Sequence, residues 1–152
     1  MPIPVRVTFG RRSREPGTGM SIQVNLFGLK TLERSIKGPL LAQTLREGAE
    51  PMLVEAKANW PVLTGASRST LRIEDVEVGD RRARIALGVG GPPLIEHPDN
   101  PSRRDYAPII ELIGSPLGRG KDTIRDAVYG NEDRLKQVVR ERLGQEIDRA
   151  TR

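Results

Sequence analysis

The side chains that most often carry enzymatic chemistry are scarce in this sequence. Its 152 residues include one histidine, His97, and no cysteine. A thiolate zinc site, a cysteine nucleophile and a pair of histidine ligands are therefore excluded within these residues. Ser67 and Ser69 lie near Thr64, but no histidine or other base stands near them in sequence. His97 precedes a proline in a polar stretch, so we interpret it as a solvated side chain.

Two further groups of residues contain the residue types of a ligand-binding site, but their spacing along the sequence does not match one. Glu74, Asp75 and Glu77 form an acidic cluster, but they lack the spacing of a calcium-binding loop. The glycines of residues 88–91 precede two prolines, whereas a phosphate loop ends in Gly-Lys-Ser/Thr and opens a helix. We interpret the acids as solvated and the glycines as the end of a strand. We therefore expect no catalytic residue, no metal ligand, no cofactor and no enzymatic activity.

The positive charge of the chain points to nucleic acid as a partner, but the distribution of that charge argues against it. The 25 Lys and Arg exceed the 20 Asp and Glu, which gives a net charge of +5. The arginines cluster in predicted loops, turns or strand edges, and none forms a basic face on a helix. Only Tyr106 and Tyr129 are available as stacking tyrosines. A small basic nucleic-acid-binding module is kept as the alternative function. The clusters are Arg11, Arg12 and Arg14, then Arg81, Arg82 and Arg84, and finally Arg103 and Arg104.

Two strands are predicted at the start of the chain. Residues 3–9 and 22–26 alternate apolar and polar side chains, which is the pattern of half-buried strands. Residues 10–19 between them are polar and contain Gly and Pro, so we expect a long exposed hairpin arm. The alternating apolar positions are Ile3, Val5, Val7, Phe9, Ile22, Val24 and Leu26.

Helical spacing predicts a short helix over residues 29–37 and a longer one that begins near Pro39. Gly38 closes the first, and Pro39 suits the first turn of the second because its missing N–H costs nothing there. Pro51 removes an internal hydrogen bond and crowds the carbonyl of Glu47, so it should kink or split the longer helix. The apolar stripe of that helix comprises Leu41, Leu45, Ala49, Met52, Leu53, Ala56 and Trp60.

Two more strands and a C-terminal helical region follow. Strands are predicted around 71–78 and 85–89, and the spacing from Ile73 to Val76 indicates a β-bulge. The helical pattern after residue 124 is broken near Gly130.

The order of these elements predicts one α+β domain over residues 1–152. An antiparallel sheet of about four strands would pack against a long kinked helix and a C-terminal amphipathic helix. The Pro- and Gly-rich residues 90–105 form the second predicted loop arm. No apolar run has the length of a membrane helix, and the opening MPIPVRV lacks the pattern of a signal peptide. We therefore expect a protein made in the cytoplasm without a membrane partner.

One acidic residue stands in an otherwise apolar segment. Residues 106–114, YAPIIELIG, surround Glu111 with isoleucine and leucine. A carboxylate in such a segment must be exposed or paired. Arg68 or Arg72 would be a natural partner if the two segments meet. The buried apolar residues of the segment are expected to be Ile109, Ile110 and either Leu112 or Ile113.

Short motifs follow one another in a defined order over residues 30–150. A helix rich in Ala and Glu ends in a Pro-x-x-Thr-Gly turn, and two strands follow it. A Tyr-Ala-x-x-x-Glu-x-x-Gly segment then precedes the C-terminal amphipathic helix. In these motifs, their order and their separations, the chain resembles the tail-completion or head–tail joining proteins of long-tailed bacteriophages. The motif residues are Pro61, Thr64, Gly65, Arg68, Tyr106, Ala107, Glu111 and Gly114.

The chain departs from the family pattern at three places. Leu63 stands where an Asp is common before the Thr-Gly pair. Leu112 and Ile113 replace the more usual aromatic residue before the glycine, and the Pro-Phe segment often seen before the last helix is missing. These departures concern the local docking surface more than the fold.

The resemblance implies a virion structural protein of the phage neck, where stacked rings join the portal of the head to the tail tube around a channel for DNA. It implies a homo-oligomeric ring that contacts a connector or head-closure protein and a tail-terminator or tail-tube protein. DNA would pass through the channel without sequence-specific contacts. The motifs are compatible with a head-closure, a tail-completion or a terminator ring.

The motif residues are expected to shape the fold, whereas the two loop arms are expected to contact partners. Such arms would become ordered on assembly. The candidate contact residues of the arms are Arg11, Arg12, Arg14, Pro92, Pro93, His97, Arg103 and Arg104.

Overall fold

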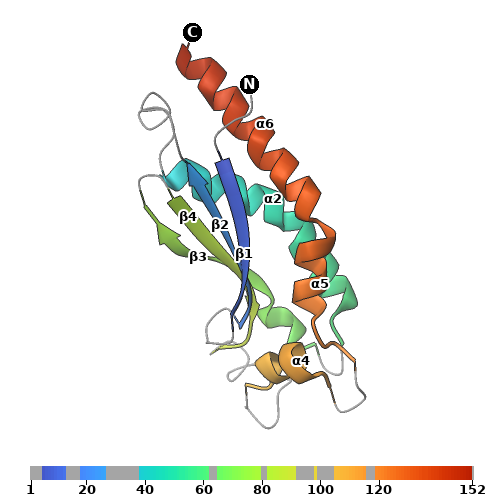
Figure 1. Cartoon of the computed structure of the whole chain (residues 1–152). Helices are drawn as coiled ribbons and strands as arrows, with labels where there is room; N and C mark the ends of the chain where they lie inside the picture. The colour runs from blue at the N-terminus through green and yellow to red at the C-terminus, as the bar shows by residue number, and fades with distance from the viewer. Residues whose placement is uncertain are drawn as a thin grey trace.

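A four-stranded antiparallel sheet with helices packed against it forms the frame of the protein (Figure 1). The structure, a computed structural model, describes residues 5–12, 18–26, 38–61, 65–79, 82–91, 98, 105–115 and 119–151. The α+β class predicted from the sequence is confirmed. The elements are β1 (Val5–Arg12), β2 (Thr18–Leu26), α2 (Gly38–Asn59), the 3-10 helix η1 (Arg68–Thr70), β3 (Arg72–Val78), β4 (Arg82–Val89), α4 (Ala107–Ile113), α5 (Thr123–Gly130) and α6 (Glu132–Thr151).

The sheet has the strand order β1-β2-β4-β3, and each neighbouring pair is antiparallel. Alternating side chains on each strand divide into a face toward the helices and an outer face. Val24 of β2 points into the core, opposite the half-buried Val7 of β1. The register of β3 on β4 shifts between Asp75 and Glu77, which is the β-bulge that the sequence predicts.

The strands β1 and β2 run further than the sequence pattern predicts. Arg11 pairs with Met20 and Arg12 with Gly19, so both ends of the predicted arm over residues 10–19 belong to the sheet. Backbone pairing needs no apolar side chain, so the alternation of side chains does not mark these ends of the strands. Gly19 has a positive φ of 146° and lies close to the carbonyl of Leu87. A Cβ at this position would lie 2.4 Å from that oxygen. Residues 13–17, and the helix predicted over 29–37, lie outside the described residues.

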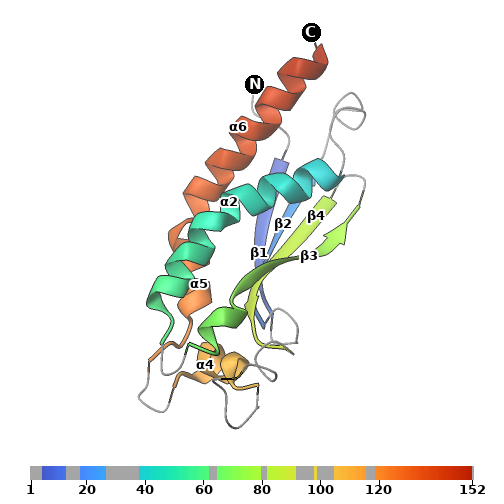
Figure 2. The ribbon, with the colours of Figure 1, turned by 180° about the vertical axis from the view of Figure 1, so that it is seen from behind.

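Helix α2 is one continuous helix that bends along its length (Figure 2). Pro51 lies inside it, which confirms the kinked form of the prediction and not the split one. Both halves are held by burial of the apolar stripe, because Leu45 before Pro51 and Met52 after it are each fully buried. Packing therefore offsets the hydrogen bond that the proline removes.

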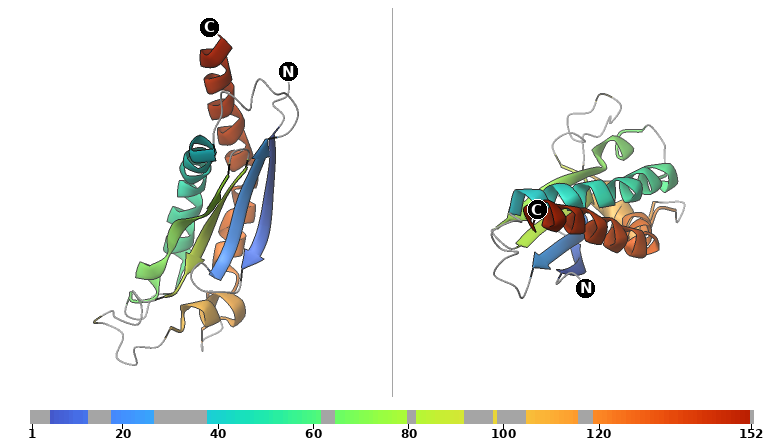
Figure 3. Two further views of the ribbon diagram at one scale, coloured as in Figure 1. Left: turned by 90° about the vertical axis from the view of Figure 1, so that its left-hand side faces the viewer. Right: turned by 90° about the horizontal axis from the view of Figure 1, so that it is seen from above.

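The C-terminal helices break where the sequence predicts. Helix α5 ends at Gly130, and α6 begins at Glu132. Asn131 between them donates from Nδ2 to the carbonyl of Ala127 at 2.8 Å and to Glu55 Oε2 at 2.9 Å. Figure 3 shows α2 and α6 side by side against the sheet, and the C-terminal end of α6 projects past the strands.

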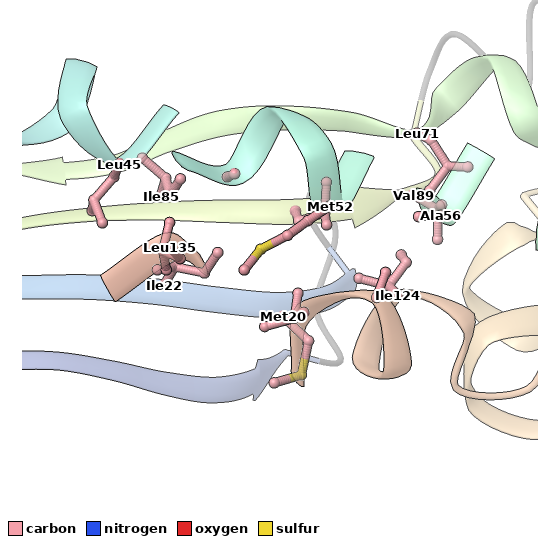
Figure 4. Packing of buried hydrophobic residues seen from close by; sticks show 14 of the residues in the cluster. Met20, Ile22, Leu45, Met52, Ala56, Leu71, Ile85, Val89, Ile124 and Leu135 are labelled. Atoms are coloured by element: carbon pink, nitrogen blue, oxygen red, sulfur yellow. The ribbon is translucent and has the colours of Figure 1, made fainter. Parts of the chain in front are cut away.

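The core lies between the sheet and the helices (Figure 4). It is mainly aliphatic, and Trp60, just after α2, is its one buried aromatic residue among those described. Its labelled side chains come from β2 and β4, from α2, from the residue between η1 and β3, and from the two C-terminal helices: Met20, Ile22, Leu45, Met52, Ala56, Leu71, Ile85, Val89, Ile124 and Leu135.

One glycine, Gly48, allows α2 to pack closely against α6. Gly48 is buried, and a Cβ on it would lie 2.5 Å from Leu135 Cδ1. Leu135 is itself fully buried, so it has little room to move. We expect Gly48→Ala to lower the free energy of unfolding by about 1–3 kcal/mol, because overpacking outweighs the higher helix propensity of alanine.

Urea unfolding followed by circular dichroism measures this effect. Gly130→Ala is the matched control, because the nearest atom to its Cβ, Glu55 Oε2, lies 3.9 Å away. Equal stability of the two variants would contradict the packing argument.

Candidate functional site

The motif residues that the structure describes lie at one end of the molecule. There α2 ends, η1 follows, and α4 meets the start of α5 (Figure 1). Thr64 lies outside the described residues. This end of the molecule, built from residues 60–61, 65–71, 105–115 and 119–125, is called the motif corner below.

Glu111 is the acidic residue at the centre of the motif corner. Only 1% of its surface is exposed. Its Oε2 accepts the N–H of Ile124 at 3.0 Å, and its Oε1 accepts the N–H of Arg125 at 3.1 Å. Its backbone carbonyl accepts the N–H of Asp122 at 2.9 Å. The first amides of a helix have no partner within the helix, so a side chain of α4 caps α5 from a distant part of the sequence.

The position of the residue before α5 explains why a distant carboxylate takes this role. Asp122 has the left-handed conformation, with φ 57° and ψ 23°, and its side chain makes no cap hydrogen bond to α5. Its carboxylate instead accepts a hydrogen bond from Arg11 Nη1 at 2.6 Å, and Arg125 lies 3.6 Å away. The hydrogen bond from Arg11 lowers the pKa of Asp122. Arg11 therefore anchors β1 to the motif corner.

The proton affinity of Glu111 is set by two opposing effects. Burial disfavours its charged form and raises its pKa from 4.5 to about 7. The hydrogen bonds from Ile124 and Arg125 and the positive charge of Arg11 act in the opposite direction, while the charge of Asp122 raises the value further. The cost of removing the charged carboxylate from water is larger than the stabilisation that the two amides give it. The pKa of Glu111 therefore lies near neutral pH.

The predicted partners of Glu111 are wrong. Arg72 donates to Glu74 Oε1 at 2.6 Å and to the carbonyls of Thr70 and Gly90, and Arg68 is an exposed residue of η1. The physical reason is that two backbone N–H groups of helix α5 lie beside the Glu111 carboxylate, where the sequence predicted an arginine. Arg11, predicted as a partner-contact residue of an arm, donates to Asp122 and to the carbonyl of Glu111 in its own chain.

Close backbone packing joins the end of α2 to α4. Gly120 has φ +88°, and a Cβ on it would lie 2.6 Å from Pro61 Cγ and 2.8 Å from Ile110 Cγ2. Gly114 ends α4 with φ 103°, and its N–H donates to the carbonyls of Ile109 and Ile110. Ala107 at the first position of α4 is fully buried. The absence of a side chain at Gly120 therefore lets the segment before α5 pack closely against Pro61 and α4.

A chain of hydrogen bonds connects the end of α2 to strand β4. Trp60 Nε1 donates to Ser67 Oγ at 2.9 Å, and Thr70 Oγ1 donates to the carbonyl of Ser67 at 2.7 Å. Thr70 Oγ1 also accepts the N–H of Gly90 at 2.9 Å. Ser67 and Thr70 are buried, so these hydroxyls satisfy buried donors. Sequence reasoning missed this role because hydroxyl pairing across a turn has no local signature.

The burial predicted for the segment over residues 106–114 is partly wrong. Ile110 is buried, but Ile109 and Ile113 are 55% and 73% exposed on α4. The segment forms a helix, so residues four apart share a face, and the face that carries Ala107 and Glu111 turns inward. The outward face of α4 therefore presents two isoleucines at the end of the molecule.

The acidic cluster of β3 has partners in its own chain. Glu74 pairs with Arg72, Asp75 with Arg46 at 2.8 Å, and Glu77 with Arg82. Among the described residues, no group of three or more metal-ligating side chains could hold an ion. No described helix combines the length and apolar character needed to cross a membrane.

The second predicted arm lies largely outside the described residues. This applies to His97, Arg103 and Arg104 and to the two prolines at positions 92 and 93, and to Arg14 of the first arm. On either side of it, the N–H of Gly91 donates to Asp105 Oδ2 at 2.8 Å, so residues 91 and 105 lie close together.

Comparison of the chain with known proteins finds no match. No family model, curated protein or solved structure matches the chain.

The buried carboxyl predicts a pH dependence of stability. Because its pKa is about 7 in the fold and 4.5 as a free side chain, the folded protein binds more protons than the unfolded chain between these values. The free energy of unfolding should therefore fall as pH rises through this window, by about 3 kcal/mol in total. Asp122 titrates below the window, because its pKa is lowered from 3.8.

Urea midpoints of the wild type and Glu111→Gln, measured from pH 4 to 8, test this prediction. The variant should lack the Glu111 contribution, so the stability difference between the two proteins should change with pH. Glu141→Gln, on an exposed position of α6, is the control and should keep the wild-type profile. A constant difference between the wild type and Glu111→Gln would contradict the assignment.

The hydroxyl of Ser67 predicts a second effect on stability. Ser67→Ala leaves the buried Trp60 N–H without its acceptor, so we expect a loss of about 1–3 kcal/mol. Trp60 is the one tryptophan of the chain, and its fluorescence reports unfolding directly. Ser69→Ala, at an exposed position nearby, should cost less. Equal losses for the two variants would count against this role of Ser67.

Proposed function

We propose that the chain is a structural subunit of the neck of a long-tailed bacteriophage, where it forms or joins a ring that connects the head to the tail. Its partners would be further copies of itself, a connector or head-closure protein, and a tail-terminator or tail-tube protein. It would be made in the host cytoplasm and reside in the virion. DNA would pass through the ring without sequence-specific contacts.

The observation that carries this proposal is the convergence of the motif residues. Pro61 and Gly65 follow α2, whereas Ala107, Glu111 and Gly114 belong to α4 or end it, and Gly120 lies close to both Pro61 and Ile110 of α4. Their interactions are a helix cap, close backbone approaches and buried small side chains. These interactions stabilise the fold, as we expect for the motif residues of a structural protein.

The charges of the described surface favour this function over a basic nucleic-acid-binding module. Phosphate binding needs cations that are free to replace counterions. Seven of the described basic side chains lie within 4 Å of a carboxylate of the same chain. These are Arg11, Arg46, Arg72, Arg82, Arg125, Lys136 and Arg149.

Surfaces suited to protein contacts remain at the ends and edges of the fold. Ile109 and Ile113 project from α4 at one end, and α6 projects past the sheet at the other (Figures 1 and 2). Val76 and Val78 of the edge strand β3 are 39% and 45% exposed. These surfaces include both ends of the molecule and one edge of the sheet, which supports a subunit that contacts neighbours in more than one direction.

The mass of the purified protein in solution tests the proposal. Light scattering after size exclusion should give a ring-sized oligomer, either for the protein alone or after mixing with connector and tail-tube proteins. A monomer that ignores every virion protein but binds DNA with a steep salt dependence would contradict the proposal and support the basic module.

A further inference from the structure

The sheet ends in two edge strands that have opposite directions. Among the described residues, β1 pairs only with β2, and β3 pairs only with β4. Each of the three neighbouring pairs is antiparallel, so β1 and β3, at positions one and four, run in opposite directions. A second copy placed beside the first in the same orientation would set its β1 antiparallel to β3. This arrangement repeats the pairing that already exists within the sheet.

The charges of the two edges differ in sign. Strand β1, VRVTFGRR, contains three arginines, of which Arg11 is paired with Asp122, and no acidic residue, whereas β3, RIEDVEV, contains three acids and one arginine. Pairing β1 with another β1 would set arginines against arginines, and pairing β3 with β3 would set acids against acids. Like charges on adjacent strands are destabilising and opposite charges are stabilising. The charges therefore select contact between unlike edges.

The ion pairs of β3 within the chain leave its acids accessible. The side chains of Arg82 and Glu77 are 50% and 38% exposed. An exposed pair of this kind contributes little to stability, so an arginine from a neighbour can share the carboxylate at small cost. Val76 and Val78 are exposed on the same strand, and a neighbouring strand would cover them. An exposed apolar edge is a template for pairing with another chain.

The strand registers identify the residues that would meet. Glu77 pairs with Arg84, Arg84 with Gln23, and Gln23 with Thr8. In a sheet continued at the same level, Glu77 of one copy is therefore level with Thr8 of the next, and Arg6 lies on the same face two residues away. The β-bulge between Asp75 and Glu77 increases the local twist, which curves a continued sheet.

We propose that the β3 edge of one copy binds the β1 edge of the next, with Glu77 opposite Thr8 and diagonal to Arg6 on the same face. Such a contact joins two different surfaces, so it repeats from copy to copy and closes a ring when the rotation allows it. The inference rests on the proposed ring function and names the surface that would build the ring.

Charge reversal tests the pairing in the full-length protein. Arg6→Glu and Glu77→Arg should each weaken self-association about tenfold, because each replaces an attraction with a repulsion at the contact. The double variant restores an opposite pair at every contact and should recover the wild-type mass in light scattering. Arg134→Glu and Glu141→Arg, at exposed positions of α6, make the same changes in charge away from both edges and should have no effect.

The other outcomes separate the two proposals. If either single variant strengthens association, like edges meet and the inference is overturned. If a ring forms but none of the variants changes its mass, another surface builds the ring, and the inference fails while the neck function stands. If the wild type stays monomeric, the inference is again overturned, and binding to connector and tube proteins then decides the neck function.

Cross-linking gives a second measurement that does not depend on charge. The chain has no cysteine, so Thr8→Cys and Val76→Cys introduce unique thiols on β1 and β3. Within one chain these strands are three spacings apart, about 14 Å, beyond the reach of a shorter thiol cross-linker. The double variant should give a ladder of trimers and larger species. Dimers from Thr8→Cys alone, or no ladder from the double variant, would contradict the pairing.

Discussion

The capping of helix α5 by the carboxylate of Glu111 is the interaction on which the motif corner depends. The residue before α5 turns away into the left-handed conformation and binds Arg11, so the first amides of the helix need an acceptor from elsewhere. Glu111 supplies both of its oxygens from α4, and its backbone carbonyl holds Asp122. Burial makes the charge on this carboxyl expensive, and the two amides offset part of that cost. One residue, Glu111, therefore fixes α4 and α5 through its side chain and, through its backbone carbonyl and Asp122, strand β1.

This arrangement separates the parts of the molecule that hold the fold from those available to partners. The motif corner is closed by buried hydroxyls, closely packed glycines and the Glu111 cap. The edges of the sheet and the outward face of α4 remain accessible. A subunit that must assemble without distortion benefits from this division, because contacts with neighbours then do not disturb the core.

The sequence predicts the helices and strands better than the contacts that connect them. Alternation and helical spacing locate the strands, the bulge near Val76, the long helix around Pro51 and the break at Gly130, because these depend on local patterns. The cap of α5 was not predictable, since the acceptor lies thirteen residues from the amide of Ile124 and its donors are backbone groups. The motif did mark Glu111 as a residue that must be buried with a partner or exposed, but it indicated arginine partners in place of amides.

Hydrogen exchange of the free subunit and of its assembly tests the central claim, that a pre-formed motif corner supports separate contact surfaces. The amides of Ile124 and Arg125 should be protected to the same extent in both states, since the Glu111 cap exists in the single chain. Protection should increase on assembly along β1 and β3. Protection of the α5 amides that arises only in the assembly would contradict the account, because the corner would then be a product of partner binding.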